Sequence, residues 1–172
     1  MTEAANIFRS RRSIRKYTAE KIPSDTINEI LRDAMSGPSA MRLDPWEFIV
    51  IDDEKILADI AQYMPHGAFL KDASHGIIVC GDIDRAHINS ISYLLQDVSA
   101  AVENLLLSAE AHDIGTCWLG VHPREERMEA IAKYFNLPSN IIPVAAVAMG
   151  FKAEDKEPQS RFDINKIHYN KF

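Results

Sequence analysis

The sequence predicts an α+β or mixed α/β fold in which helices cover a sheet. Short apolar and β-branched runs, such as Trp46–Ile51 and His75–Gly81, are typical of strands. Longer segments with apolar residues at helical spacing lie between these runs. Because the two kinds of segment alternate only loosely, a regular strand-helix-strand repeat is not indicated.

The length and composition predict one domain spanning residues 1–172. Of the 172 residues, 47% are hydrophobic and 26% charged, a balance that suits one buried core. We find no internal repeat, low-complexity tract or Gly/Ser linker that would divide the chain. Residues from about 151 to 172 form a polar tail after the last predicted strand.

Five helices are expected. The first runs from about Thr2 into an arginine-rich stretch, and the second begins at Pro23-Ser24 and ends at Gly37-Pro38. The last three are expected after Asp52-Asp53, from about Ile91 to His112, and from Pro123 to about Phe135. The helix from Ile91 to His112 is the longest. Its broad apolar face predicts a central, largely buried helix, and Gly115 is expected to stop it.

Two further strands complete the predicted sheet. Thr116–Leu119 is a short strand, and Pro143–Met149 is the last core strand, which Gly150 is expected to close. No G-x-G-x-x-G follows a strand, and no G-x-x-x-x-G-K-[ST] is present. Neither common nucleotide-binding fingerprint therefore applies.

The charge and cysteine content narrow the function classes. The chain has 19 Lys and Arg against 25 Asp and Glu, a net charge of −6, which argues against a general nucleic-acid binder. The net charge does not exclude a local anion site. Cys80 and Cys117 lie in apolar runs without a C-x-x-C, as expected of reduced thiols. With no signal peptide or membrane-length apolar run, we expect a soluble cytoplasmic protein with no membrane partner.

The first candidate site is the basic stretch RSRRSIRKY at residues 9–17. Arg11 and Arg12 beside Ser13 would suit a phosphate, because guanidinium groups bind phosphate oxygens bidentately and a hydroxyl adds a donor. Arg11 and Arg15 could share one face if the first helix continued through them. Taken alone, however, such a run is more often an exposed cationic surface.

Three later stretches also carry candidate residues. GPSAMRLDPW at residues 37–46 is a rigid loop that could place backbone donors and Ser39 against a planar ligand. WLGVHP at residues 118–123 brings a strand to Gly120, which permits close backbone approach. Arg161 follows the last strand and could return to the basic stretch. Each has a plain structural interpretation when it is considered alone.

Together and in this order, the four stretches resemble the nitroreductase family of flavin enzymes. RRSIRKY resembles the N-terminal signature of that family, and PSAMRLDPW resembles its Pro-Ser loop. The Ala-rich long helix running into GTCWLG resembles its central helix and following strand. Gly150 followed by Arg161 resembles its C-terminal phosphate contact. The resemblance spans nearly the whole chain.

The resemblance implies a three-layer α+β homodimer. Its central, mostly antiparallel sheet is covered by helices, and the tail packs on the partner.

The resemblance implies FMN bound at the dimer interface. Residues implied for the phosphate end are Arg11 and Arg161, with Arg12 and Ser13 at the phosphate, ribityl chain or ring edge, and Gln159 as a weaker candidate. Residues implied for the ring are Arg15 at the pyrimidine edge, Leu119, and Gly120 with its amide near N5. Residues implied to come from the other subunit are Pro38, Ser39, Ala40 and Met41.

The implied activity is ping-pong hydride transfer from NADH or NADPH, through flavin N5, to an electron-poor acceptor such as a nitroaromatic or a quinone. The cofactor carries this chemistry, so we predict neither a side-chain nucleophile nor a metal site. His66 and His122 are weak candidates for a proton donor. The alternatives are a specialised flavoprotein of the same fold (a dehalogenase, a heterocycle oxidase or a flavin-degrading enzyme), a non-catalytic flavin-binding module, and a nucleic-acid-binding arm.

Two features depart from the family pattern. Arg42 and Asp44 stand where the family often has Asn and Gln, so Arg42 adds a cation to the site or pairs with Asp44. Only residues 82–92 are available to form a lid, which predicts a pocket that is open or closed by the partner chain.

Overall fold

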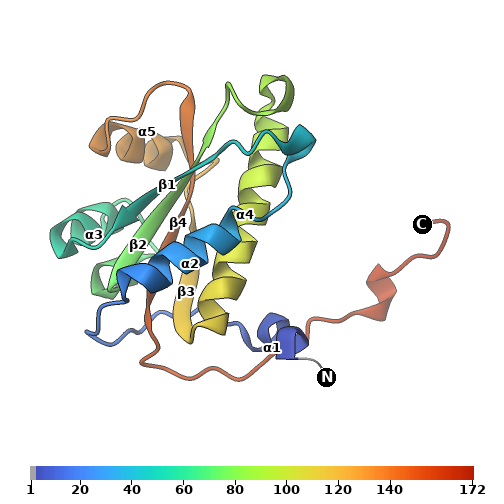
Figure 1. The fold of residues 1–172 in the computed structure, drawn as a ribbon, viewed down its shortest axis with the longest axis horizontal. Helices are drawn as coiled ribbons and strands as arrows, with labels where there is room; N and C mark the ends of the chain where they lie inside the picture. Colours follow the sequence, from blue (N-terminus) through green and yellow to red (C-terminus); the bar gives the residue numbers. More distant parts are fainter. Residues whose placement is uncertain (1–2) are drawn as a thin grey trace.

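The computed structural model describes residues 3–172, with side chains from Asn6 onward. Its centre is an antiparallel sheet of four strands in the order β1-β2-β4-β3 (Figure 1). The strands are β1 Trp46–Ile51, β2 His75–Asp82, β3 Ile114–Gly120 and β4 Ile141–Phe151. This sheet confirms the predicted α+β class and its antiparallel pairing.

The described residues also form five α-helices and four short 3-10 turns. The helices are α1 Glu3–Ser10, α2 Ser24–Ala34, α3 Glu54–Ala61, α4 Ile91–Ala111 and α5 Glu125–Tyr134. The 3-10 turns are η1 Ala40–Arg42, η2 Ala68–Asp72, η3 His87–Asn89 and η4 Ile164–Lys166. The expected helices are thus confirmed within a few residues, although Thr2 lies outside the described residues.

The sheet is the middle of three layers because successive residues of β2 face opposite sides. Ile77 and Val79 belong to the core that the sheet forms with α2 and α4. Ile78 and Cys80 belong to a second core, which includes residues of α3, η2 and α5. Strand side chains alternate between faces, so a strand buried on both faces shows the continuous apolar run found here. The predicted cover of helices is therefore present on both faces.

Helix α4 is central, as its broad apolar face predicted. Leu94, Val98 and Leu105 are fully buried, and Ala101 and Ala109 add small buried residues on the same helix. Apolar residues around so much of the circumference are typical of a helix packed on several sides. Gly115 does not end the helix, contrary to the expectation from the sequence. Its turn into β3 instead uses Asp113 in a left-handed conformation, with φ 59°.

The arginine-rich stretch is extended rather than helical. Helix α1 ends at Ser10, and the next residues run along the sheet, where Ser13 bridges Thr116 and Tyr17 bridges Lys152. The first helix thus runs into this stretch as expected, but it ends at Ser10 and does not continue through Arg11 and Arg15. Arg11 and Arg15 do not share a helical face; they lie at opposite ends of an extended segment.

Gly115 and Gly150 explain how this segment lies so close to the sheet. Both were expected to end elements, but they lie inside β3 and β4 and pair with each other. A Cβ atom on Gly115 would lie 2.8 Å from Ile14, and one on Gly150 would lie 2.9 Å from Tyr17. Side chains do not approach a Cβ that closely, so the two glycines form a platform for Ile14 and Tyr17.

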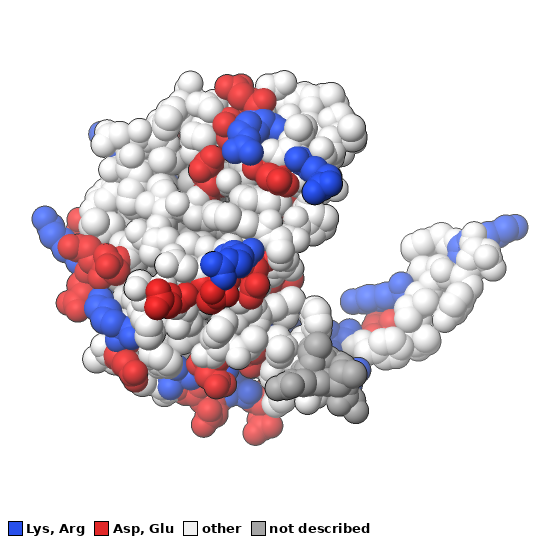
Figure 2. Space-filling model, in the orientation of Figure 1, with Lys and Arg blue, Asp and Glu red and all other residues white. Residues whose placement is uncertain are grey.

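The chain beyond β4 forms a tail that leads away from the body (Figure 1). Residues 155–172 are all exposed, and η4 is the only helical turn among them. Figure 2 shows the distal part of the tail standing clear of the rest of the surface. Within residues 3–172, none of the helices has the length and apolar character needed to span a bilayer.

Candidate functional site

The basic stretch is anchored by specific contacts and is not a loose surface arm. Ile14 is buried against the sheet, and the Tyr17 hydroxyl donates a hydrogen bond of 2.6 Å to the Ile14 carbonyl. Two residues after β4 hold the other side. Glu154 accepts from the Arg15 backbone N–H at 2.6 Å, and Lys156 Nζ donates to the Ser13 carbonyl at 2.6 Å. The backbone of this stretch is therefore fixed from both sides.

Glu154 is ionised when it makes this contact. The hydrogen bond from the Arg15 backbone N–H, with help from the nearby Lys156 ammonium, lowers the pKa of Glu154 below its ordinary value. A carboxylate that accepts a backbone N–H and pairs with a cation is favoured in its charged form. Glu154 therefore positions Arg15 at neutral pH without supplying chemistry.

The first cavity, which we call the tail cavity, has a volume of about 840 Å³. It lies between the end of α1 and the tail, and it is lined by Arg11, Arg12, Gln159 and Arg161 among others. Within the described residues, the guanidinium groups of Arg11 and Arg161 have neither a hydrogen bond nor an ion pair. Two such groups facing one cavity can bind a dianion, and phosphate suits guanidinium geometry.

Arg12 lies at the same cavity, but its guanidinium is already occupied. Nη1 donates to its neighbour Arg11 O at 2.6 Å, Nη2 to Arg9 O at 2.7 Å, and Nε to Glu157 O at 3.0 Å. The last bond joins the basic stretch to the start of the tail. In this structure Arg12 therefore positions the tail, and its contact with a cofactor stays a prediction.

The second cavity, which we call the ring cavity, has a volume of about 240 Å³. It brings together three predicted residues, Arg15, Leu119 and Gly120. Arg15 lies over the Phe69 ring, 5.7 Å from its centroid. A Cβ on Gly120 would have the His122 carbonyl oxygen, 4.0 Å away, as its nearest contact, so space is open beside this glycine. An apolar wall with the cations of Arg15 and Arg127 beside it suits a planar, electron-poor ring.

The two cavities are connected by the basic stretch itself. Arg11 lines the tail cavity and Arg15 lines the ring cavity. Four residues of extended chain span at most about 14 Å. A ligand with a phosphate at one end and a planar ring at the other, joined by a flexible chain, could reach both. The donor set therefore fits FMN.

The loop of Pro38, Ser39, Ala40 and Met41 lines neither cavity. It is held in a rare conformation, because Met41, Arg42 and Asp44 all have positive φ. Such backbone strain in residues other than glycine is uncommon and concentrates at functional sites. Met41 is 75% exposed, so the loop presents an apolar side chain to its surroundings.

Two carboxylates hold this loop. Ser39 Oγ donates to Asp44 Oδ1 at 2.5 Å and accepts from the Asp44 N–H at 3.1 Å. Buried Asp97 of α4 accepts from the Ala40 N–H at 2.9 Å, while its Oδ2 has no partner among the described residues. Asp44 thus bonds Ser39 and forms no ion pair with Arg42 within the described residues. The predicted alternative in which Arg42 pairs with Asp44 is therefore not found in the described residues.

Several residues of the site were not predicted from the sequence. Glu154 and Lys156 fix the basic stretch, and Phe69 lies under Arg15. Arg127 of α5 donates from Nη1 to the Gly120 carbonyl at 2.7 Å. Glu154 and Lys156 are charged residues shortly before Gln159 and Arg161 in the sequence, which is a weak signal of a role at the site. For Phe69 and Arg127, no local pattern in the sequence indicates a role.

Of the two candidate proton donors, only His66 reaches the site. His66 lines the ring cavity and is exposed, whereas His122 lines none of the cavities described above. Cys117 also lines the ring cavity. Burial raises the pKa of its thiol, which therefore stays protonated at neutral pH.

Comparisons with known proteins match this chain over almost its whole length. The family model described as "Nitroreductase family" matches residues 8–67 and 65–151. A Methanothermobacter thermautotrophicus protein named "Putative NADH dehydrogenase/NAD(P)H nitroreductase" is 40% identical over 165 residues, covering 96% of this chain and 85% of the relative.

Two solved structures have the same fold. An "FMN-dependent Nitroreductase" from Clostridium difficile has a TM-score of 0.90 at 28% identity, covering 98% of this chain and 99% of its own. A "putative nitroreductase in complex with fmn" from Desulfovibrio desulfuricans has a TM-score of 0.87 at 27% identity, covering 100% and 99%. These names agree with the enzyme class and the cofactor that the sequence predicted.

Proposed function

The chain belongs to the nitroreductase family, and we propose that it is an FMN-dependent oxidoreductase that passes a hydride from NAD(P)H to an electron-poor acceptor. One observation carries the proposal. The basic stretch is fixed on the sheet so that Arg11, unpaired within the described residues, lines one cavity while Arg15 lines another. A solvated basic arm would need neither the glycine platform nor the anchoring by Glu154 and Lys156.

We propose that the tail cavity binds the phosphate. Arg11 and Arg161 supply charge-assisted hydrogen bonds, and Gln159 adds an amide on the same side. Arg12 holds the tail in place through the Glu157 carbonyl. This arrangement accounts for a concentration of cations in an acidic protein.

We propose that the ring cavity holds the isoalloxazine ring. When bound, FMN supplies a ring that accepts a hydride and passes it on. Arg15 places a positive charge at one edge of this cavity and so favours the negative charge of the reduced ring. Leu119 provides an apolar wall, and the absence of a side chain on Gly120 leaves room for the ring to lie against the strand.

The acceptor is proposed to be a nitroaromatic, a quinone or a similar small molecule. It would follow the oxidised nicotinamide into the same space, which gives ping-pong kinetics. Parallel lines in double-reciprocal plots at several acceptor concentrations are the expected signature. Intersecting lines would mean that reductant and acceptor bind together, and would contradict a shared space.

A homodimer completes the proposed site. The Pro38–Met41 loop is strained and presents Met41, yet it lies outside both cavities of its own chain, which supports a contact with the FMN of the partner. The tail carries large exposed apolar side chains. They are Phe162, Ile164, Ile167, Tyr169 and Phe172. Isolated apolar side chains on an extended tail are a poor arrangement in water, so we propose that residues 151–172 of the single domain 1–172 pack on the partner subunit.

The predicted cytoplasmic location is part of the same proposal. Cys80 and Cys117 are free thiols and both are buried. Unpaired cysteines are typical of a reducing compartment.

The test is a visible absorption spectrum of the purified protein before and after anaerobic addition of NADH or NADPH. We expect a flavin spectrum that bleaches with the reductant and returns when a quinone is added. Bound flavin that neither nucleotide bleaches would favour a carrier module or a specialised flavoprotein. A colourless protein that FMN cannot reconstitute would contradict the proposal.

A further inference from the structure

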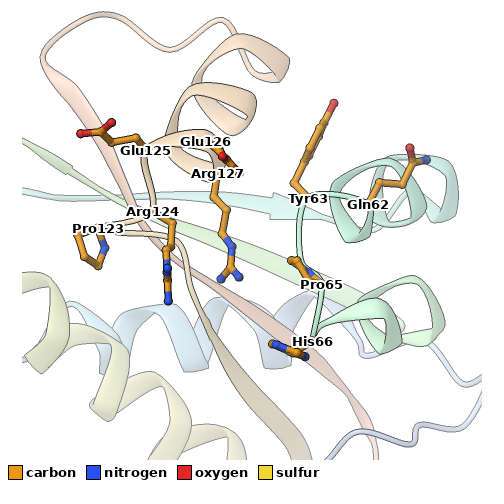
Figure 3. Close-up of a pocket in the computed structure, with 9 residues that line it drawn as sticks. All are labelled: Gln62, Tyr63, Pro65, His66, Pro123, Arg124, Glu125, Glu126 and Arg127. Atoms are coloured by element: carbon orange, nitrogen blue, oxygen red, sulfur yellow. The ribbon is translucent and has the colours of Figure 1, made fainter.

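A third cavity, which we call the α3–α5 cavity, adjoins the ring cavity. It lies between the turn after α3 and the start of α5 and has a volume of about 760 Å³ (Figure 3). His66 and Arg127 line both cavities. The α3–α5 cavity is therefore a continuation of the space that we assign to the ring.

The α3–α5 cavity carries two arginines that lie side by side. Figure 3 shows the side chains of Arg124 and Arg127 extending in the same direction, toward the level of His66, while Glu125 points away from them. The Arg124 guanidinium has neither a hydrogen bond nor an ion pair within the described residues. Arg127 uses Nη1 on the Gly120 carbonyl, which leaves its other N–H groups available.

Two carboxylates also line this cavity, but neither pairs directly with the arginines. Glu125 and Glu126 form no ion pair with Arg124 or Arg127 in the described part of the chain. Helix α5 begins at Glu125, and the carboxylates of Glu125 and Glu126 in its first turn offset the positive end of the helix. The cavity thus offers two guanidinium groups to an anion.

We propose that the α3–α5 cavity binds the diphosphate of the nicotinamide dinucleotide, with the nicotinamide lying against the flavin ring that we assign to the adjoining ring cavity. This inference rests on the proposed function. The ring cavity of about 240 Å³ is taken up by the flavin ring, whereas the α3–α5 cavity of about 760 Å³ alone has the size of a usual ligand site. Guanidinium groups are suited to phosphate oxygens, and Arg127 links the two spaces through its bond to Gly120.

The test compares two reductants in wild type and Arg124→Gln, with menadione as an uncharged acceptor. NADH carries the diphosphate, and N-benzyl-1,4-dihydronicotinamide does not. We expect the KM for NADH to rise about tenfold or more, because a charge-assisted hydrogen bond is lost. The kcat, the rate with the benzyl compound and the FMN affinity should not change. An unchanged KM for NADH, or equal losses with both reductants, would overturn the proposal.

An acidic acceptor would use the same chemistry, so it forms a separate arm of the test. With the benzyl compound as reductant, p-nitrobenzoate and nitrobenzene differ only in one carboxylate. A KM that rises in Arg124→Gln for p-nitrobenzoate, but not for NADH, would assign the cavity to the acceptor and overturn our assignment. Arg32→Gln is the control for the loss of charge alone. Arg32 lies on α2, far in sequence from Arg124, and it pairs with Glu29.

Calorimetric titration of the FMN-loaded protein with NAD⁺ provides a readout that does not depend on turnover. We expect binding in wild type that weakens about tenfold in Arg124→Gln. Absence of NAD⁺ binding in wild type, or equal binding by both proteins, would contradict the proposal. If neither reductant bleaches the flavin, the proposed function fails; if both bleach it and only the NADH dependence on Arg124 is missing, this inference alone fails.

Discussion

The ring cavity and the tail cavity differ in what holds their residues in place. Leu119 and Gly120 belong to β3, and Arg15 is fixed by Glu154 on a segment packed against two strand glycines. Arg161 and Gln159 belong to an extended tail whose residues are all exposed. One cavity is built by the sheet of a single chain. The other depends on a segment with little packing of its own.

The difference indicates that one fold can combine a rigid site, which we propose for the flavin ring, with an adaptable site, which we propose for its phosphate. A ring that accepts hydride must lie in a defined position, and strands define positions better than tails. A phosphate needs charge more than exact placement, and long arginine side chains tolerate movement. We expect changes to the sheet to affect stability, and changes to the tail to affect binding.

Truncation after Glu157 should have the largest effect on binding and the smallest on the fold. It removes Arg161 and the apolar side chains that we assign to the partner contact. We expect FMN affinity to fall by at least about a hundredfold, since charge-assisted bonds and the dimer contact are lost together. The measurements are FMN titration and sedimentation velocity, with circular dichroism as the control for folding. A truncated protein that stays dimeric and binds FMN normally would contradict the tail's role.

Arg11→Ala should weaken FMN binding without unfolding the protein. The Arg11 guanidinium makes no hydrogen bond or ion pair within the described residues, so its loss leaves nothing unpaired. We expect a cost of about 1.5–3 kcal/mol in FMN binding. Fluorescence titration of the apoprotein measures it. Arg32→Ala is the matched surface control, and an Arg11 variant with wild-type affinity would return Arg11 to the exposed surface.

Substitutions at three glycines sharpen the comparison within the sheet itself. Gly150→Ala places a Cβ 2.9 Å from Tyr17, and Gly115→Ala places one 2.8 Å from Ile14, so we expect each to lower the free energy of unfolding by about 1–3 kcal/mol. Gly120→Ala has no contact closer than 4.0 Å and should change stability by less than about 0.5 kcal/mol. Urea unfolding of the three apoproteins measures both values.

The same variants separate stability from binding. Gly120→Ala should weaken FMN binding because its methyl group enters the space assigned to the ring. If Gly120→Ala destabilises the apoprotein as much as Gly150→Ala does, the space beside Gly120 is packed rather than open. If it leaves FMN affinity unchanged, the ring does not lie against this strand.

The smallest expected effect concerns pH and Glu154. The Arg15 backbone N–H lowers the pKa of Glu154 in the folded state. Glu154 therefore stabilises the fold above its ordinary pKa of 4.5, and this contribution is lost as the pH falls through the lower folded value. We expect the difference in unfolding midpoint between wild type and Glu154→Gln to be greatest near neutral pH and to shrink below pH 4.5. A difference that is independent of pH would exclude a charged Glu154 as the anchor of Arg15.

Much of the fold was predictable because its signals are local. Trp46–Ile51 was predicted as a strand with the bounds that the structure shows, and the long helix near Ile91 was predicted to within one residue at its end. Hydrophobic period and length distinguish such elements without tertiary information. The flavin-family resemblance rested on four motifs in order, and the family comparison confirms it.

The roles of Gly115 and Gly150 could not be predicted from local signals. A glycine after a helix or strand usually ends it, but these two provide close approach to Ile14 and Tyr17, which lie about a hundred residues or more away in sequence. The contacts of Glu154 and Lys156 with the basic stretch have the same origin. Long-range approach is set by the packed sheet, and a single sequence carries no periodic signal for it.

Sedimentation velocity of the FMN-loaded protein, detected in the visible flavin band, tests most directly whether two chains share the site. The account predicts that flavin absorbance sediments in one boundary at twice the mass of the 19.4 kDa chain. Flavin sedimenting at the mass of a single chain would contradict the assignment of Pro38–Met41 and the tail to a partner's site. Flavin that does not sediment with the protein would contradict the cofactor site itself.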